Sequence, residues 1–285
     1  MSQGKKNSQA KEVWKRLKKN KSAMIGLAIL VMLTVSAIFA NVIAPYPYDE
    51  QNLSELLKGP SAAHLFGTDN FGRDIFSRVL YGGRISLIVG LISVAIGCGV
   101  GGTLGAMAAY YGGRLDTVIM RIMDVMLAMP NLLLAIALSA CLGPGLFNAI
   151  LAVGISNIPT YARVVRASVM TVKTQEYVEA AHALGVKNRR IILKHIIPNA
   201  LAPIIVQASL GVAGAILVAA SLSFIGLGVQ PPTPEWGSML SAGREYIRNY
   251  WHMVTFPGLA IMLTICSLNL LGDGLRDALD PRLKR

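Results

Sequence analysis

Long runs without a charged residue constrain this 285-residue chain more than any other feature. Residues 24–44 carry no charge, and none occurs between Asp124 and Arg163. A bilayer core about 30 Å thick is crossed by roughly 20 apolar residues of helix, so the second run is too long for one crossing. The sequence GPG at residues 143–145 interrupts it with a predicted turn. We expect six membrane spans: 24–44, 85–111, one beginning near Thr117, one ending near Ala162, 200–229 and 253–272.

The composition supports this interpretation. Hydrophobic residues make up 53% of the chain and charged residues 15%, and the mean hydropathy is +0.52. An ordinary soluble domain is less apolar than this. The sequence therefore predicts an all-α, polytopic membrane protein with six transmembrane helices.

The basic residues predict the orientation of the spans. With six crossings, 20 Lys and Arg residues lie on the side that holds both termini and residues 163–199, and 6 lie on the other side. Short cytosolic loops carry the excess of Lys and Arg, so we expect both termini in the cytosol. The net charge of +12 then reflects topology in the lipid bilayer, and no nucleic-acid partner is expected.

This orientation divides the chain into a series of segments. Two shorter features within them are also predicted. Val13, Trp14 and Leu17 recur at helical spacing, as in a helix on the inner leaflet, although a solvated tail would satisfy the same charge rule. From Arg73 onward, the sequence suits an interfacial helix, with Ser77 and Arg78 on one side and apolar residues on the other. The apolar residues are Ile75, Phe76, Val79 and Leu80. The predicted segments are a cytosolic tail (1–23), the first span (24–44), an extracytosolic segment (45–84), a core of five spans that includes cytosolic residues 163–199 (85–272), and a second cytosolic tail (273–285).

Glycines recur every four residues in the second span, at Gly97, Gly101 and Gly105. Small residues at this spacing let helix backbones approach closely inside a membrane, where the hydrophobic effect does not hold helices together. We predict that these glycines serve helix packing rather than ligand binding.

Charges and prolines inside the spans have structural interpretations. Arg121 and Asp124 are three residues apart, so they can neutralise each other on one helix face, although an intramembrane charge can also be functional. Pro130, Pro203 and Pro257 predict bends in their helices.

Polar residues in the spans allow two interpretations. They could line a wet pathway, or each could bond to a neighbouring helix. The sequence contains no phosphate-binding glycine-lysine loop, HExxH, GxSxG or paired-Cys motif. We therefore expect no catalytic residue, no metal site and no cofactor bound by this chain. The polar residues considered for a pathway are Asn131, Asn157, Gln207 and Ser209.

One long charged segment lies between the fourth and the fifth predicted span. Residues 176–184, read as helix, place an apolar face at Tyr177, Ala180, Ala181 and Leu184. Gly185 is expected to end that helix, and a second is expected to begin near Asn188 and to end at Pro198. Such a helix pair could dock into a partner protein or lie as a hairpin on the membrane surface.

The sequence EAAHALG, from Glu179 to Gly185, together with Ile197 and Pro198, resembles the EAA loop of binding-protein-dependent ABC importer permeases. His195 and Ile197 depart from the usual pattern, in which Ile and Leu stand at these positions. Three further segments are similar to the "C" permease subunits of dipeptide, oligopeptide and nickel importers. They are residues 66–87, 223–240 and 271–284.

The resemblance implies a function and a set of partners. The chain would form a translocation pathway with a homologous permease in the plasma membrane of a bacterium or archaeon, for di- or oligopeptides, with nickel or another small solute as the alternative. A substrate-binding protein would lie outside, and two ATPase subunits inside would bind ATP and magnesium. A stand-alone secondary transporter is the rival interpretation, but the chain shows no internal repeat and no charge at mid-membrane. The residues expected to couple this chain to an ATPase subunit are Glu179, Ala180, Ala181, Leu184 and Gly185.

Overall fold

The computed structural model describes residues 11–279, and within that range the chain is built from helices without a β-strand. The all-α prediction is therefore confirmed. Residues 11–17 are helical, and α2 (Lys21–Ile38) follows them. The Asn20 side chain accepts a hydrogen bond from the N–H of Ala23, which satisfies one of the free donors at the start of α2. The short helices α3 (Ala40–Ile43) and η1 (Leu53–Glu55) come next.

The second span is part of one long helix. It comprises α4 (Ile75–Ile96), the π-helix η2 (Gly97–Gly101) and α5 (Gly102–Tyr111), which continue without a break for 37 residues. The expectation of an interfacial helix with an exposed polar side is wrong, because Ser77 and Arg78 are buried. Residues 45–74 fold over this end of the helix and supply polar partners, such as the Tyr48 carbonyl that accepts from Arg78 at 2.7 Å.

The third expected span is bent. Helices α6 (Gly113–Leu127) and α7 (Asn131–Leu142) meet at an angle of 89°, and Pro130 lies at the break. A residue that precedes proline avoids the helical conformation, so the helix ends there. The predicted bend at Pro130 is confirmed, whereas Pro203 and Pro257 lie inside helices that continue through them.

The remaining helices complete the core. The predicted GPG turn precedes α8, with φ of +87° at Gly143 and +140° at Gly145. Pro198 does not end a helix as expected, because the chain stays helical from Asn188 to Phe224. A π-helical turn that ends at Ile196, two residues before Pro198, widens the helix, and this accommodates a residue that has no N–H. The elements in order are α8 (Leu146–Lys173), α9 (Glu176–Ala183), α10 (Asn188–Ile191), the π-helix η3 (Ile192–Ile196), α11 (Ile197–Phe224), α12 (Trp236–Gly243), η4 (Arg244–Tyr246) and α13 (His252–Leu279).

Four helices of the described chain are long and apolar enough to cross a membrane. They are α2, the helix from α4 to α5, the helix from α10 to α11, and α13. The bent pair α6 and α7 adds a fifth if it forms one span. Helix α8 has 28 residues but carries arginines and asparagines, so the count of six spans stays a prediction.

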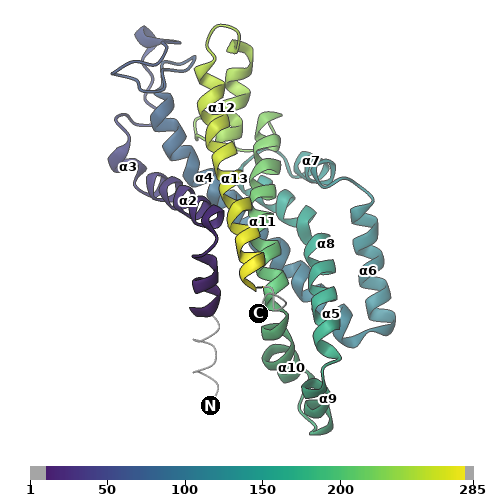
Figure 1. Ribbon diagram of the computed structural model, residues 1–285. Coiled ribbons are helices and arrows are strands. Elements are labelled where there is room, and N and C mark those ends of the chain that lie inside the picture. Colours follow the sequence, from purple (N-terminus) through teal and green to yellow (C-terminus); the bar gives the residue numbers. More distant parts are fainter. Residues whose placement is uncertain (1–10, 280–285) are drawn as a thin grey trace.

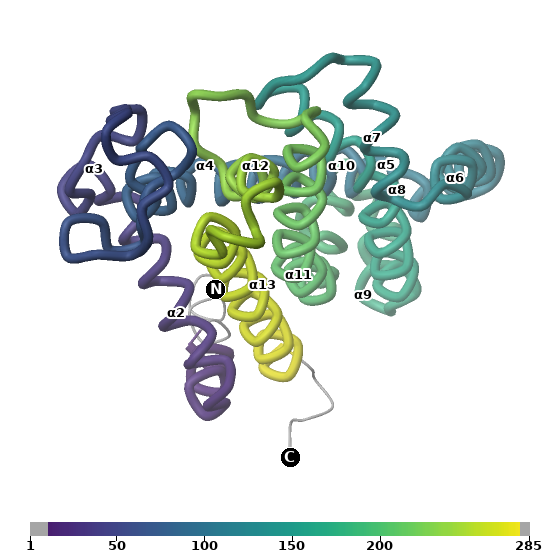
Figure 2. The backbone as a smooth tube through the Cα atoms, turned by 90° about the horizontal axis from the view of Figure 1, so that it is seen from above, coloured from purple at the N-terminus to yellow at the C-terminus, as the bar shows by residue number. Residues whose placement is uncertain are grey.

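The helices place the segments with functional interest at opposite ends of the molecule (Figure 1). Helices α9 and α10, residues 11–17 and the last turns of α13 lie at one end, and α12 and residues 45–74 lie at the other. Helix α8 packs against α5 and α11, and α13 packs against α2 and α11. Viewed from above, α6 lies at the edge farthest from α3 (Figure 2).

The N-terminal helical residues pack on the chain itself. Leu17 is buried against Ala23 and Ala278, and Val13 packs at the edge of this cluster. This face of the tail is therefore neither in solvent nor on lipid, whereas Trp14 is exposed. The charge pattern alone could not show this contact, because its partner lies at the other end of the sequence.

Candidate coupling site

The charged segment is a helix, a glycine turn and a second helix, as predicted. At the turn, the N–H of Val186 donates to the carbonyl of Ala181 at 3.1 Å, and that of Gly185 donates to His182 at 2.9 Å. These two bonds form a Schellman motif, whose residue after the helix needs a positive φ. Gly185 has a φ of +70°, and the second helix begins at Asn188. We call residues 174–196 the coupling segment.

The buried face of α9 differs from the predicted one. Ala181 is only 7% exposed and Val178 is fully buried, and both pack in a cluster that includes Ile191 and Ile196. Tyr177, by contrast, is 43% exposed. The expectation that Ala181 shares an outward face with Tyr177, Ala180 and Leu184 is therefore wrong. Because the two-turn helix α9 has apolar residues on both sides, either side could face the core. The position of α5 and α8 determines which side is buried.

Four of the five residues expected at the coupling site lie on the outer surface. Glu179, Ala180 and Gly185 are exposed, and Leu184 is 83% exposed at the tip beside the turn. Most of the Leu184 side chain therefore makes no contact with the rest of the described chain. The structure thus brings Glu179, Ala180, Leu184 and Gly185 to one protruding tip and directs Ala181 inward.

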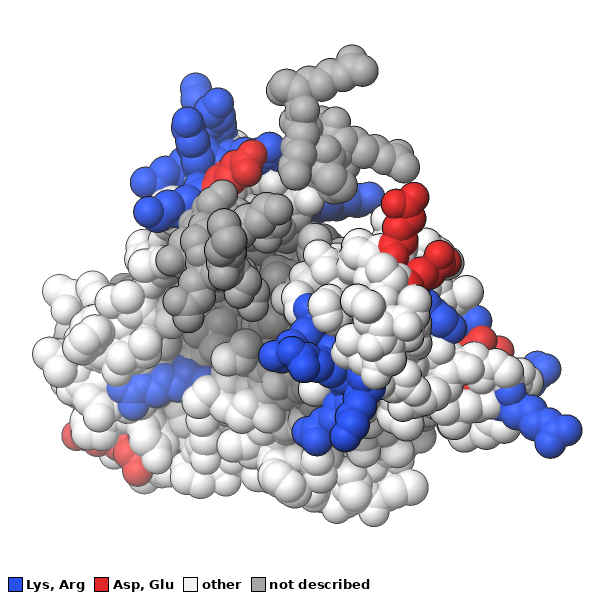
Figure 3. Space-filling view, turned by 90° about the horizontal axis from the view of Figure 1, so that it is seen from below, with Lys and Arg blue, Asp and Glu red and all other residues white. Residues whose placement is uncertain are grey.

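Charges differ between the two arms of the coupling segment. Helix α9 begins with the acidic residues Glu176 and Glu179, whereas the second arm presents only basic ones. Figure 3, which views this end of the molecule, shows basic side chains in separate groups divided by uncharged surface. The exposed basic residues of the second arm are Lys187, Arg189, Arg190 and Lys194.

Polar contacts fix the coupling segment to the core, and the sequence interpretation did not include them. The hydroxyl of Tyr110, at the end of α5, donates to Oδ1 of Asn188 at 2.8 Å and lies 3.2 Å from Nε2 of His182. The Lys173 ammonium group donates to the carbonyl of Tyr110 at 2.7 Å. A pair of tyrosines before two glycines at a predicted cytosolic end was the available signal, but nothing local indicates the partners of Tyr110.

His195 lies in η3. Its carbonyl accepts from Nδ2 of Asn199 at 2.6 Å, and its side chain is half-buried in η3. Within residues 11–279, no group of three or more His, Cys, Asp or Glu side chains is arranged to hold a metal ion.

The glycine column of the second span lies against α8. A Cβ atom added at Gly101 would overlap the carbonyl oxygen of Ile158, and one at Gly105 would overlap that of Ala162. At Gly97 it would lie 3.0 Å from the Cβ of Asn157. The backbones of the two helices therefore approach too closely here for any side chain at Gly101 or Gly105.

Ion pairs tie α6 to α8 instead of forming within α6. Asp124 pairs with Arg163 at 2.6 Å rather than with Arg121, so the predicted pair is wrong. Arg166 forms a second pair with Asp116. Ion pairs between the two helices form instead of the pair within α6, because α8 lies alongside α6 and brings two guanidinium groups within reach of the α6 carboxylates.

The polar residues considered for a pathway separate into two groups. Nδ2 of Asn131 donates to Oδ1 of Asn157 at 3.0 Å, and this pair lies near the middle of the 28-residue α8. Ser209 instead donates to the carbonyl of Val206 in its own helix, and Gln207 lies half-buried on the same helix. The structure therefore brings Asn131 and Asn157 together but not Gln207 and Ser209.

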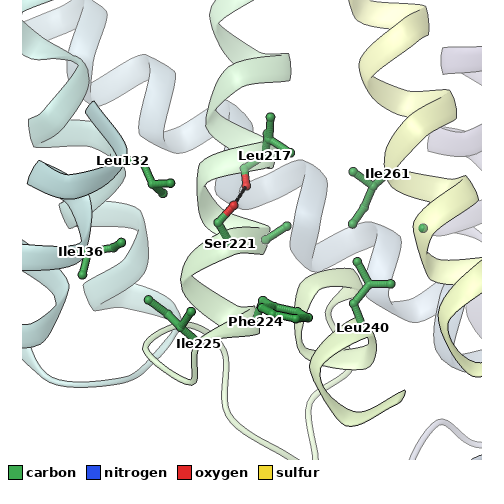
Figure 4. Close-up of a pocket in the computed structure, with 10 residues that line it drawn as sticks. Leu132, Ile136, Leu217, Ser221, Phe224, Ile225, Leu240 and Ile261 are labelled. Carbon is green, nitrogen blue, oxygen red and sulfur yellow. Dashed lines mark hydrogen bonds between the residues drawn. The ribbon is translucent and has the colours of Figure 1, made fainter. Parts of the chain in front are cut away.

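An apolar hollow of about 300 Å³ opens beside Asn131, whose neighbour Leu132 lines it. Helices α7, α11, α12 and α13 line it, and Leu132, Leu217 and Phe224 point into it (Figure 4). Ser221 is its one hydroxyl side chain, and its Oγ donates to the Leu217 carbonyl at 2.8 Å. The hollow therefore offers apolar contact and few hydrogen bonds.

Solved structures show where this fold occurs. The structure matches an inward-facing methionine ABC transporter, MetNI, with a TM-score of 0.59 at 19% identity, covering 72% of this chain and 98% of that one. An amino acid ABC transporter matches with a TM-score of 0.55 at 16% identity, covering 71% and 94%. At these identities the matches establish the fold alone.

Two family profiles and several relatives match the sequence. Residues 101–285 match the binding-protein-dependent transport system inner membrane component, and residues 8–60 match the N-terminal TM domain of oligopeptide transport permease C. A dipeptide transport system permease protein of Alkalihalophilus pseudofirmus is 53% identical over 96% of this chain and 90% of the relative. A di/tripeptide permease protein of Pseudomonas aeruginosa is 48% identical (97% and 93%), as is a glutathione permease protein of Escherichia coli (96% and 90%). The chain thus belongs to the inner membrane components of binding-protein-dependent transport systems, in their dipeptide and oligopeptide permease branch.

Proposed function

We propose that this chain is one of two permease subunits that together form the membrane pathway of an ABC importer for short peptides. The family membership and the protruding coupling segment carry this proposal. Relatives named for dipeptides, for di- and tripeptides and for the tripeptide glutathione share 46–53% identity with it, so the substrate class is a peptide of two or three residues. The chain performs no covalent chemistry, and ATP hydrolysis takes place in partner subunits.

The coupling segment is the docking surface for an ATPase subunit. Leu184 would enter an apolar pocket of that subunit, because it is the most exposed large hydrophobic side chain of the segment. The acidic start of α9 and the basic second arm would fix the orientation, since a partner with the opposite arrangement of charges fits in only one direction. Ala181 stabilises this tip by packing on its buried side, and Gly185 does so by adopting the positive φ that the turn needs.

The surface around Asn131 and Asn157 faces the pathway. Exposed amides are unfavourable against lipid, so helices with such groups turn them toward water or toward another protein chain. The apolar hollow beside them would give passing peptides weak contacts that bind no particular side chain. Gln207 and Ser209 remain candidates for the same surface of α11.

The orientation follows from docking at the coupling segment. With α9 and α10 in the cytosol, residues 11–17 and the end of α13 lie on the cytosolic side as well. Residues 45–74 and α12 then lie outside, where a substrate-binding protein would deliver the peptide. The protein would span the plasma membrane of a bacterium or archaeon with both termini inside.

A matched pair of substitutions tests the function. Leu184→Glu is expected to release the ATPase subunits from the purified complex and to abolish uptake of a labelled dipeptide, because a carboxylate would enter an apolar pocket. Leu53→Glu places the same change on an exposed leucine at the opposite end of the molecule and should leave the ATPase subunits bound. Full retention of the ATPase subunits by Leu184→Glu would contradict docking at this tip. Uptake of nickel but not of dipeptides or tripeptides by the wild-type complex would contradict the substrate class.

A further inference from the structure

One hydroxyl group bonds to both arms of the coupling segment. The Tyr110 side chain is buried, and its hydroxyl has a single proton, which it donates to Asn188. His182 must therefore be the donor in its 3.2 Å contact with the same oxygen. Its ring also stacks on that of Tyr110, with centroids 5.9 Å apart. His182 lies three residues before Gly185 and Asn188 lies three residues after it, so Tyr110 bridges the turn.

The backbone of Tyr110 is itself held firmly. Lys173, the last residue of α8, donates to the carbonyls of Ala109 and Tyr110 at 3.3 and 2.7 Å. These carbonyls lie in the last turn of α5, where no helical N–H follows to bond them. A cation at a helix C-terminus also interacts favourably with the helix dipole. The end of α5 is thus fixed to α8, while the Tyr110 side chain is fixed to the coupling segment.

Tyr110 lies at the end of a long uninterrupted helix that leads to the opposite side of the molecule, one of two 37-residue helices in the described chain. This helix begins at Ile75 and has 37 residues, which at about 1.5 Å per residue gives it a length of about 55 Å. Asp74 caps its far end and bonds to Nδ1 of His64 at 2.9 Å within residues 45–74. A displacement of the coupling segment therefore has a direct helical connection to the extracytosolic segment.

We propose that Tyr110 is the positioning residue that transmits movement of the coupling segment to this long helix. The apolar contacts of Val178, Ala181 and Ile191 hold the segment against the core, but such contacts are not directional and allow sliding. The hydrogen bonds through Tyr110 fix the register of both arms relative to α5. This inference rests on the proposed docking of the coupling segment to an ATPase subunit.

The test uses the complete transporter in liposomes and measures ATP hydrolysed per molecule of labelled dipeptide taken up. Tyr110→Phe keeps the ring and removes the hydroxyl, and we expect this ratio to rise about tenfold, the effect of losing one or two net hydrogen bonds. Tyr111→Phe is the matched control, because Tyr111 is an exposed neighbour on the same turn. It should keep the wild-type ratio.

A second pair of variants separates positioning from folding. Asn188→Asp retains an acceptor for the Tyr110 hydroxyl and should keep the wild-type ratio, whereas Asn188→Leu removes the acceptor and should raise it. A merely structural role would lower hydrolysis and uptake in proportion, and an unchanged ratio in Tyr110→Phe and Asn188→Leu would overturn the proposal. If the ratio is unchanged but Leu184→Glu still releases the ATPase subunits in the same preparation, the proposed docking is correct and only the role of Tyr110 is wrong.

Discussion

The guanidinium group of Arg166 on α8 donates two hydrogen bonds, 2.6 and 2.7 Å long, to the two carboxylate oxygens of Asp116 on α6. Both side chains are about a quarter to a third exposed, so solvent weakens the pair only in part. Helix α6 lies at the edge of the molecule and packs against α5 and α8, with Ile119 and Met123 buried in this contact. The ion pair therefore adds a polar contact to the apolar packing between α6 and α8.

Arg166→Met is expected to destabilise the purified chain by about 1 kcal/mol, because it leaves the Asp116 carboxylate without its partner. Thermal unfolding in detergent measures this change. Arg163→Met is the control, since the Arg163–Asp124 pair is about half exposed and should matter less. An equal loss in both variants would show that burial does not determine the strength of these pairs.

Gly101→Ala is expected to destabilise the packing of η2 against α8 by about 3 kcal/mol or more, because even one methyl group overlaps the Ile158 backbone. Gly99→Ala in the same π-helix is the matched control, since a Cβ there meets no atom within 4 Å. Thermal unfolding and co-purification with the homologous permease measure the difference. If Gly101→Ala unfolds at the wild-type temperature, the two helices are not in close contact.

Ala181→Glu is expected to unfold the coupling segment rather than only weaken docking. Its carboxylate would be buried among Val178, Ile191 and Ile196 without a partner, at a cost of about 3 kcal/mol. Limited proteolysis of the chain without ATPase subunits should cut between α8 and α11 in this variant. Leu184→Glu, on the exposed tip, should remain as resistant as wild type, and equal cleavage of the two would contradict the observed burial of Ala181.

The pH dependence of residues 45–74 follows from His64. Burial lowers the pKa of His64, but its hydrogen bonds with Glu55 and Asp74, at 2.8 and 2.9 Å, outweigh burial and raise the pKa above the ordinary value. A raised pKa means that the stabilisation is complete below the unfolded pKa, about 6.5, and is lost as the pH rises through the folded value. Hydrogen bonds from His64 and Lys58 lower the pKa of Glu55, so its own contribution is lost only as the pH falls through that lowered value.

We therefore expect hydrogen exchange in residues 52–74, corrected for its intrinsic pH dependence, to slow as the pH is lowered from about 8 to about 6. His64→Gln should abolish this pH dependence, because a neutral amide does not titrate. A corrected exchange rate that is constant over this range in the wild-type chain would show that His64 does not contribute through its charge.

Local features were predictable from the sequence because they depend on short stretches of chain. Uncharged runs indicated the apolar helices, and Gly143, Gly145 and Gly185 marked turns that require a positive φ. The start of the second arm at Asn188 followed from the position of Gly185. The EAA sequence indicated the family before any contact was known, and the family profiles and relatives confirm it.

The tertiary structure decided which surface each residue faces and which partner it meets. Asp124 pairs with Arg163 on another helix, 39 positions away, and Tyr110 reaches His182 and Asn188, 72 and 78 positions away. Periodicity shows which residues share a face of a helix, but α9 has apolar residues on both faces. Whether Ala181 or Leu184 turns inward is set by the neighbouring helices that cover one face, and long-range packing of this kind is not encoded in any single stretch of sequence.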